Sequence, residues 1–293
     1  MKKSKKVVDT VNILLYYIAM SFDEEFAAYK EWLNQREKSK LTIRKNVRDI
    51  VKFRVFYGKS LEMITKQDIL RYKDHLIKKY KPASVNSYLI SVNNFLKFTN
   101  QDSLRVKTVK IQRRNSLDNV LTEEEYSALL ECAKDWKNKR LYYLIRTLAS
   151  SGIRVGELQY ITTNILETGK TQGRGKTKVR EIIIPRNLCN ELRDYCEEWH
   201  ITGIIFHGKQ ADALIDKARI WRELKQLART AGVPEEKVHA HNFRHFFAKR
   251  FLSKHHDIVD LADILGHNSI ETTRIYTRTS SQEKQTRIDE LNL

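Results

Sequence analysis

The sequence predicts a mainly α-helical protein with a small β-sheet, divided into two domains. Apolar residues recur at helical spacing through most of the chain, residues 101–118 lack such a stripe, and a glycine-punctuated stretch at 169–185 is typical of β-structure. A chain of 293 residues is long enough for two domains with separate cores. Hydrophobic residues make up 41% of the chain, which excludes a disordered protein.

The first domain is expected over residues 21–100 as an all-helical unit. Its first helix begins at Ser21, which with Glu24 forms a capping box. The apolar pattern then predicts further helices over 42–57, over 65–79 and from Pro82 onward.

Residues 1–20 are interpreted as an N-terminal extension. Lysines precede a short apolar run there, as in a secretory signal, but Asp9 and Asn12 interrupt the pattern and no small-residue cleavage site follows. Met20 is an alternative start of the protein. Residues 101–118 carry five basic and two acidic side chains and are predicted to form a basic linker, either solvated or running beside a polyanion.

The second domain is expected over residues 119–293. Thr122 and Glu125 form a capping box at its first helix. The stretch that ends at Pro185 predicts a β-hairpin or a three-stranded sheet, and helical patterns return at 186–199, at 211–231 and from 242.

The charge balance favours a polyanionic partner. Lys and Arg number 54 against 36 Asp and Glu, and residues 1–100 alone carry 21 basic and 10 acidic side chains. Each phosphate that such a surface neutralises releases bound counterions, so nucleic acid is the expected ligand. Three scattered cysteines predict a reduced, cytoplasmic protein, and the lack of a long apolar segment predicts no membrane contact. Within the cytoplasm, association with the nucleoid is expected.

Several side chains suit the cleavage of a phosphodiester without a metal. That chemistry needs cations on the phosphate oxygens, a proton donor for the leaving oxygen and a nucleophile with a base. His241 and Arg244 lie three apart and share a helix face, and the arginine fork suits two phosphate oxygens. Taken singly, each residue has an ordinary structural explanation, such as a surface arginine or a core tyrosine. The complete set is Arg154, Lys176 or Lys178, His241, Arg244, His267 and Tyr276.

The order of these motifs resembles the tyrosine recombinase, or phage integrase, family, including its Xer-type members. The sequence has GxRxGEL at 152–158, a basic hairpin, HxxRH at 241–245 and LGHxxxxTTxxY at 265–276. The resemblance covers about 151–276, and less specifically the helical domain at 21–100. It implies a C-shaped clamp in which a core-DNA-binding domain and a catalytic domain hold DNA between them.

The resemblance also implies roles. Arg154 and Arg244 would clamp the scissile phosphate, His241 would shuttle a proton near the nucleophile, and His267 would bond the phosphate and buttress Tyr276. Tyr276 would attack phosphorus to give a 3′-phosphotyrosyl link, its ionised form favoured by the nearby cations. A hairpin lysine would protonate the leaving oxygen: Lys176 is favoured, Lys178 is second, and Arg174 occupies the family's usual lysine position. Glu157 would support Arg154, and His245 would be structural.

The expected activity is site-specific recombination of double-stranded DNA, in integration, excision or dimer resolution, by a homotetramer on two DNA sites. No metal, ATP or other cofactor is expected, and an accessory recombination factor is left open, as is a mobile-element or chromosomal role. The alternatives are a histidine-dependent metal nuclease, a DNA-binding relative without activity, and a type IB topoisomerase. The segment 280–293 is expected to pack either on a neighbouring protomer or on its own domain.

Overall fold

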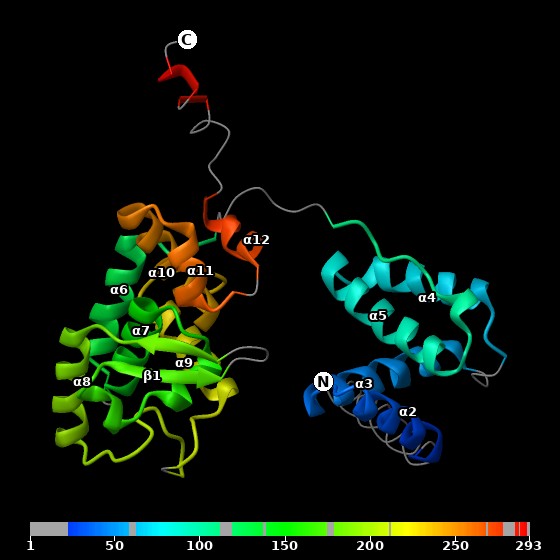
Figure 1. The fold of residues 1–293 in the computed structure, drawn as a ribbon, viewed down its shortest axis with the longest axis horizontal. Coiled ribbons are helices and arrows are strands. Elements are labelled where there is room, and N and C mark those ends of the chain that lie inside the picture. Colours follow the sequence, from blue (N-terminus) through cyan, green and yellow to red (C-terminus); the bar gives the residue numbers. More distant parts are fainter. Residues whose placement is uncertain are drawn as a thin grey trace, which may run out of the picture. The chain divides into compact units, whose positions relative to one another are not determined.

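The computed structural model separates into two compact units, residues 1–113 and 114–293. Figure 1 shows both units. The residues whose structure is described are 23–58, 63–111, 119–136, 139–174, 179–210, 212–267, 269–277, 285–286 and 288–291. The predicted extension at 1–20 and the Ser21 cap lie outside these ranges.

The N-terminal unit is built from helices, as the apolar pattern predicted. Thr65 and Asp68 form the expected capping box: the Asp68 N–H donates to the Thr65 hydroxyl at 3.3 Å, and the Thr65 N–H donates to the Asp68 carboxylate at 2.9 Å. Such a cap stabilises a helix by about 1 kcal/mol. The helices that the structure describes are α2 (Asp23–Gln35), α3 (Lys40–Tyr57), α4 (Lys66–Lys79) and α5 (Pro82–Phe98).

The core of the N-terminal unit lies between these helices and is rich in aromatic side chains. Tyr29 packs edge-on against Phe95, with ring centroids 5.2 Å apart. Burying side chains of this size supplies most of the free energy that holds four short helices together. The other fully buried members include Leu33, Ile50, Phe53, Ile69, Leu89 and Leu96.

The first part of the predicted linker is attached to the N-terminal unit. A short 3₁₀ turn, η2 (Asp102–Leu104), follows α5. Beyond it, the Asn93 side chain accepts from the Val106 N–H and donates to the Val106 carbonyl, and Asn86 makes the same pair of bonds with Val109. Residues up to 109 therefore lie along the helices, whereas the sequence placed the whole of 101–118 in a connector.

The C-terminal unit combines helices with one hairpin. Its helices are α6 (Glu123–Lys134), α7 (Arg140–Ser151), α8 (Arg186–Glu198), α9 (Lys217–Thr230), α10 (Ala240–His255), α11 (Ile258–Leu265) and α12 (Ile270–Thr273). Strands β1 (Lys170–Arg174) and β2 (Val179–Ile183) pair antiparallel, with Gln172 opposite Glu181. The sequence left a hairpin and a three-stranded sheet as alternatives, and the described residues form the two-stranded hairpin.

One helix begins later than predicted. The sequence indicated a helix from 211, but α9 begins at Lys217. The residues before it pair with an earlier segment: the Ile215 N–H donates to the Phe206 carbonyl at 3.0 Å, and the Gly208 N–H donates to the Ala213 carbonyl at 2.8 Å. These bonds, between residues five and nine positions apart, satisfy backbone groups that a helix would otherwise use.

Two clusters of buried side chains hold the C-terminal unit together. The larger cluster contains side chains from each of the helices α6 through α10 and from strand β2. Its members include Leu144, Leu148, Ile182, Leu192, Leu224 and Phe243. The smaller joins α10 and α11 to the 3₁₀ turn η5 (Arg274–Thr277), and it consists of Ala248, Leu252, Leu261, Leu265 and Tyr276. The residue predicted to be the nucleophile is therefore part of a packed cluster. Within the described ranges, no helix has the length and apolar character that crossing a membrane requires.

Candidate active site

Arg154 emerges from a tight turn at the end of α7. Gly152, the C-cap of this helix, has φ +62°, and a Cβ there would collide with the side chains of Phe247 and Leu265. Only glycine fits this turn, which leads directly into η3 (Val155–Tyr160). The Arg154 side chain is 42% exposed, and its guanidinium donates to Glu157 at 3.2 Å.

Glu157 anchors this turn from a buried position. Its side chain is 5% exposed and accepts from the Arg154 backbone N–H at 2.7 Å. It also accepts two bonds from Arg180 of β2, at 2.7 and 3.3 Å. Burial alone would raise the pKa of Glu157, but the bonds from Arg180 and the Arg154 backbone outweigh it and lower the pKa. The contact with Arg154 is the one that the sequence predicted for Glu157.

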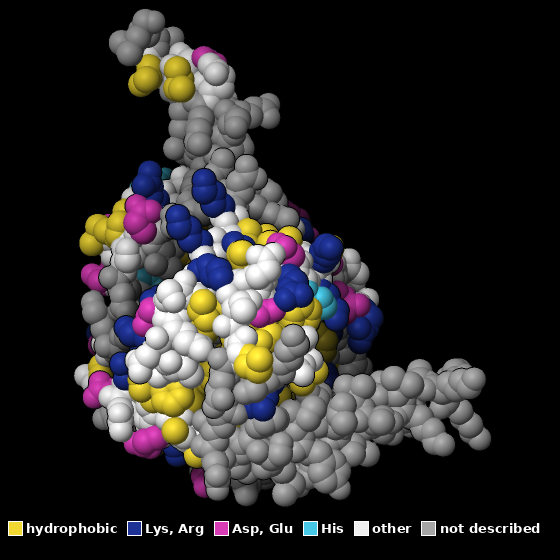
Figure 2. All heavy atoms as spheres, turned by 90° about the vertical axis from the view of Figure 1, so that its right-hand side faces the viewer, with side chains coloured by type: hydrophobic (Ala, Val, Ile, Leu, Met, Phe, Trp, Pro, Cys, Tyr) yellow, Lys and Arg dark blue, Asp and Glu magenta, His cyan; other side chains and the backbone are white. Residues whose placement is uncertain are grey.

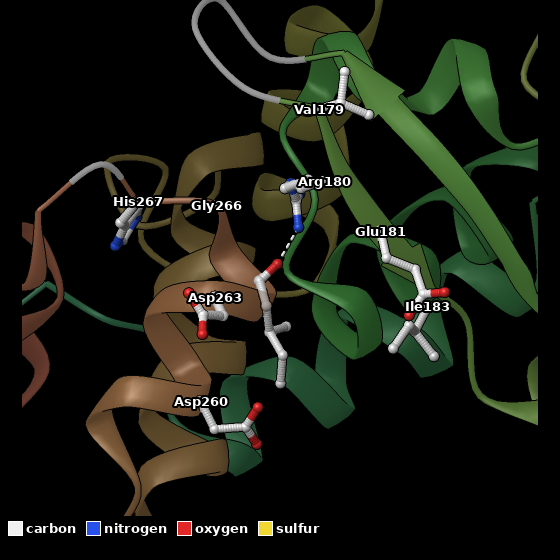
Figure 3. A pocket seen from close by; sticks show the side chains of 9 residues that line it. Val179, Arg180, Glu181, Ile183, Asp260, Asp263, Gly266 and His267 are labelled. Carbon is white, nitrogen blue, oxygen red and sulfur yellow. Dashed lines mark hydrogen bonds between the residues drawn. The ribbon is translucent and has the colours of Figure 1, made fainter.

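Arg180 is a member of this network that was not predicted from the sequence. It is 9% exposed and also donates to the carbonyl of Ile264 in the last turn of α11, the bond drawn dashed in Figure 3. It therefore ties the hairpin to the end of α11, next to His267. The signal in the sequence is the strand alternation, because Arg180 lies on the same buried face of β2 as Ile182.

A cavity of about 380 Å³ opens between β2 and α11 (Figure 3). Its wall includes the carboxylates of Glu181, Asp260 and Asp263, together with His267 at one side. Carboxylates repel a phosphate, so this cavity does not suit the DNA backbone. The cationic side of the site lies at Arg154 instead.

Arg244 lies beneath the surface, on α10. It is 1% exposed and donates at 2.7 Å to the carbonyl of Gly152 and at 2.7 Å to the carbonyl of Leu265. These are carbonyls at the C-terminal ends of α7 and α11, where the helix dipole favours a cation. Burial and the nearby charge of Arg154 lower the pKa of Arg244 to about 10, so it stays charged at neutral pH.

His267 is fixed between Arg244 and α12. An arginine can only donate, so the 2.9 Å contact with Arg244 makes Nε2 of His267 an acceptor. Its proton is then on Nδ1, which donates to the Thr273 hydroxyl at 2.7 Å. Burial and the charge of Arg244 lower the pKa of His267 to about 4, so the ring is neutral at neutral pH. His267 therefore holds Arg244 through Nε2, and its bond to phosphate stays a prediction.

Tyr276 is 7% exposed, and its hydroxyl lies 2.8 Å from Nδ1 of His245. Burial raises the pKa of Tyr276, although Arg244 and Arg154 act in the opposite direction. The arginines thus favour the ionised phenol, as the sequence predicted, but the loss of hydration outweighs them and the net pKa of Tyr276 is raised.

His245, interpreted from the sequence as structural, contacts the hydroxyl of the predicted nucleophile. His241, predicted to act near that hydroxyl, is exposed and packs edge-on against His245 with ring centroids 4.5 Å apart. The position of His245 near the nucleophile could have been predicted from its spacing of four residues from His241, because this spacing puts both histidines on one face of α10.

Lys176 and Lys178 lie outside the described residues, between Arg174 and Val179. The five other predicted residues, Arg154, His241, Arg244, His267 and Tyr276, gather around the junction of α7, α10, α11 and η5. In the part of the chain with a described structure, no three His, Cys, Asp or Glu side chains are placed to hold a metal ion.

Residues 119–283, which include Arg154 and Tyr276, match the phage integrase family, and residues 26–102 match the N-terminal SAM-like domain of phage integrases. This chain belongs to the phage integrase family. Its curated relatives include the tyrosine recombinase XerA of Pyrococcus furiosus, which is 32% identical over 92% of this chain and 93% of the relative. Tyrosine recombinase XerC of Rickettsia bellii is 28% identical over 86% of this chain and 90% of its own length.

Solved structures of other phage integrase family members share the fold. The crystal structure of XerA recombinase matches with a TM-score of 0.51 and 26% identity, over 92% of this chain and 99% of that one. XerH bound to its difH substrate in a post-cleavage complex matches with a TM-score of 0.69 and 20% identity, over 88% and 82%. Family and relatives together indicate a tyrosine-type site-specific recombinase, and the prediction of family and enzyme class is confirmed.

Proposed function

We propose that this member of the phage integrase family recombines double-stranded DNA at specific sites and uses Tyr276 as its nucleophile. The observation that carries the proposal is the convergence of a buried tyrosine hydroxyl with two arginines and three histidines from separate segments. Tyr276 touches His245, Arg244 holds His267, and the charges of Arg154 and Arg244 act on Tyr276. A cationic pocket beside a phenol suits attack on a phosphodiester.

The exposed members of the site are the first that a phosphate would meet. Arg154 and His241 reach the surface, whereas Arg244 is buried and both of its terminal nitrogens already donate to groups of the protein. Glu157 fixes the direction of Arg154 by bonding its side chain and its backbone. Arg154 and His241 would bind the phosphate oxygens, and the charge of Arg244 would stabilise the extra negative charge of the transition state through a water-poor interior.

In the proposed reaction, the Tyr276 oxygen attacks phosphorus and forms a 3′-phosphotyrosyl bond while a 5′-hydroxyl leaves. Lys176 of the hairpin would protonate that leaving oxygen, with Lys178 as the alternative. The bond energy is kept in the phosphotyrosine, so a second 5′-hydroxyl can reverse the attack. The scheme needs neither a metal nor ATP.

The DNA ligand is supported by charge as well as by the site. The chain has a formal net charge of +18, and Lys and Arg side chains are spread over the face in Figure 2, with exposed apolar side chains between them. Solved relatives include a lambda integrase tetramer bound to a Holliday junction. By this likeness, four copies of the chain would act on two DNA sites. The clamp arrangement, the accessory factor and the nucleoid location stay predictions.

The C-terminal tail is a second proposed contact in this assembly. Of its residues, 285–286 and 288–291 are described, and Ile288 and Leu291 are each 61% exposed. Two exposed apolar side chains beyond the nucleophile support the proposal that the tail packs on a neighbouring protomer.

A nicked DNA substrate, from which the short cleaved piece diffuses away, tests the proposal. The wild-type chain should accumulate a covalent complex that survives SDS, in the presence of EDTA, and Tyr276→Phe should bind the DNA but form none. Tyr195→Phe is the matched control, because Tyr195 is a buried tyrosine of α8 in the same unit. Covalent complex with Tyr276→Phe, or cleavage that EDTA abolishes, would refute the proposal and favour a metal nuclease.

A further inference from the structure

We infer that His245 accepts the phenolic proton of Tyr276 as the tyrosine oxygen attacks phosphorus, and that it returns this proton when the strands are rejoined. The inference rests on the proposed function, because it assigns the base for the same nucleophile. It transfers to His245 a proton role that the sequence had given to His241.

The geometry supplies the contact that such a transfer needs. The Tyr276 hydroxyl lies 2.8 Å from Nδ1 of His245, within the range of a direct hydrogen bond. The two rings are tilted by 55° with centroids 5.4 Å apart, so the ring of His245 does not stack on the phenol but directs its edge to the hydroxyl. His245 is on α10, whose 16 residues give it a rigid backbone.

The direction of the hydrogen bond follows from the two pKa shifts. Burial raises the pKa of Tyr276, so the phenol keeps its proton at neutral pH and its O–H donates to Nδ1. Burial and the neighbouring histidines lower the pKa of His245 to about 4, so its ring is neutral and Nδ1 is free to accept. A base that is already deprotonated in the resting protein needs no prior loss of a proton.

Charge in the surroundings would couple the transfer to DNA binding. Burial is the main cause of the low pKa of His245, and the neighbouring groups that lower it further are cationic or become cationic. A bound phosphate would offset these groups and raise the affinity of His245 for a proton. The phenol becomes a much stronger acid as its oxygen bonds to phosphorus, so the proton moves during the attack rather than before it. The titratable and charged groups around His245 are His239, His241, Arg244, His267 and Tyr276.

Two separate protons move in the proposed step. The bond between the Tyr276 oxygen and phosphorus forms, the bond between phosphorus and the 5′-oxygen breaks, and the phenolic proton goes to Nδ1 of His245. The leaving 5′-oxygen takes its own proton from a general acid, for which Lys176 is the expected residue. Rejoining reverses both transfers.

The replacement His245→Asn in the full chain separates a base from a mere hydrogen-bond partner. Asn can place an amide oxygen near the position of Nδ1 and accept the bond from Tyr276, but it cannot take the proton. With the nicked substrate at neutral pH we expect cleavage to fall by about 10²- to 10⁴-fold, the usual contribution of general base catalysis, with DNA binding retained. His255→Asn is the matched control, because His255 is an exposed histidine on the same helix.

A substrate with sulfur in place of the bridging 5′-oxygen identifies which proton is affected. A thiolate leaves without an acid, so this substrate should restore Lys176→Ala but leave His245→Asn slow. Raising the pH should also speed His245→Asn more than wild type, because the phenol then begins to ionise without help.

Cleavage by His245→Asn at the wild-type rate, or its rescue by the sulfur substrate, would overturn the assignment of the base. These results do not bear on the proposed function, which fails if Tyr276→Phe forms the covalent complex or if EDTA abolishes cleavage. The base and the nucleophile are thus tested separately.

Discussion

Replacing Arg180 with methionine should destabilise the C-terminal unit more than the loss of an exposed ion pair would. Arg180 and Glu157 form a pair in which both side chains are buried, 7% and 5% exposed. Removing one partner of a buried pair costs about 3–5 kcal/mol, because the other charge stays in a low dielectric without compensation. Methionine keeps most of the volume of the arginine stem, so little of the expected cost comes from a cavity.

The structure places the expected loss at the lower end of that range. Glu157 keeps its bonds to the backbone and side chain of Arg154, which still offset part of its charge. Against this, the Ile264 carbonyl also loses its donor. We therefore expect the free energy of unfolding to fall by about 3 kcal/mol, which corresponds to a lowering of Tm by about 6–12 °C for a unit of this size.

Thermal unfolding of the full chain, followed by circular dichroism, measures this shift in the transition of the C-terminal unit. Arg229→Met is the matched control: its partner is Glu235, the two are 60% and 44% exposed, and the loss should stay within about 1 kcal/mol. The double variant Glu157→Met/Arg180→Met should recover stability, since neither charge is then left alone. A single variant no less stable than Arg229→Met would refute the reasoning.

Two further outcomes follow from the same region. Gly266→Ala should destabilise the unit and impair cleavage, because Gly266 has φ +62° and a Cβ there would collide with the stem of Arg180. The control Gly203→Ala, at φ +73° with open space around it, should lower the free energy of unfolding by only about 1 kcal/mol. Equal losses in thermal unfolding would contradict this. The depressed pKa values of His245 and His267, each about 4, make the unfolded chain bind more protons, so stability should fall as pH drops from about 6.5 towards 4. Unfolding midpoints that stay constant over this window, or a His245→Asn variant with an unchanged pH slope, would count against that sign.

Much of the helical structure could be predicted because its signals are local. The box of Thr65 with Asp68 and the box of Thr122 with Glu125 both form as expected. A cap joins residues three positions apart, so the sequence contains all of the information. The late start of α9 shows the limit, because Ala213 and Ile215 bond to residues five and nine positions earlier, in a turn that helical periodicity does not indicate.

The sequence by itself determined the family, the division of the helical patterns into two regions and the identity of most residues that meet at the site. Only the tertiary structure decided which of them touch. The bond between His245 and Tyr276 spans 31 positions, and that between Arg180 and the carbonyl of Ile264 spans 84. The protonation of Tyr276 was also beyond the sequence, since the balance between lost hydration and nearby arginines depends on burial. Residue type fixes what a side chain can do, but distance and burial, set by the packing of distant segments, fix which partner and which charge state it has.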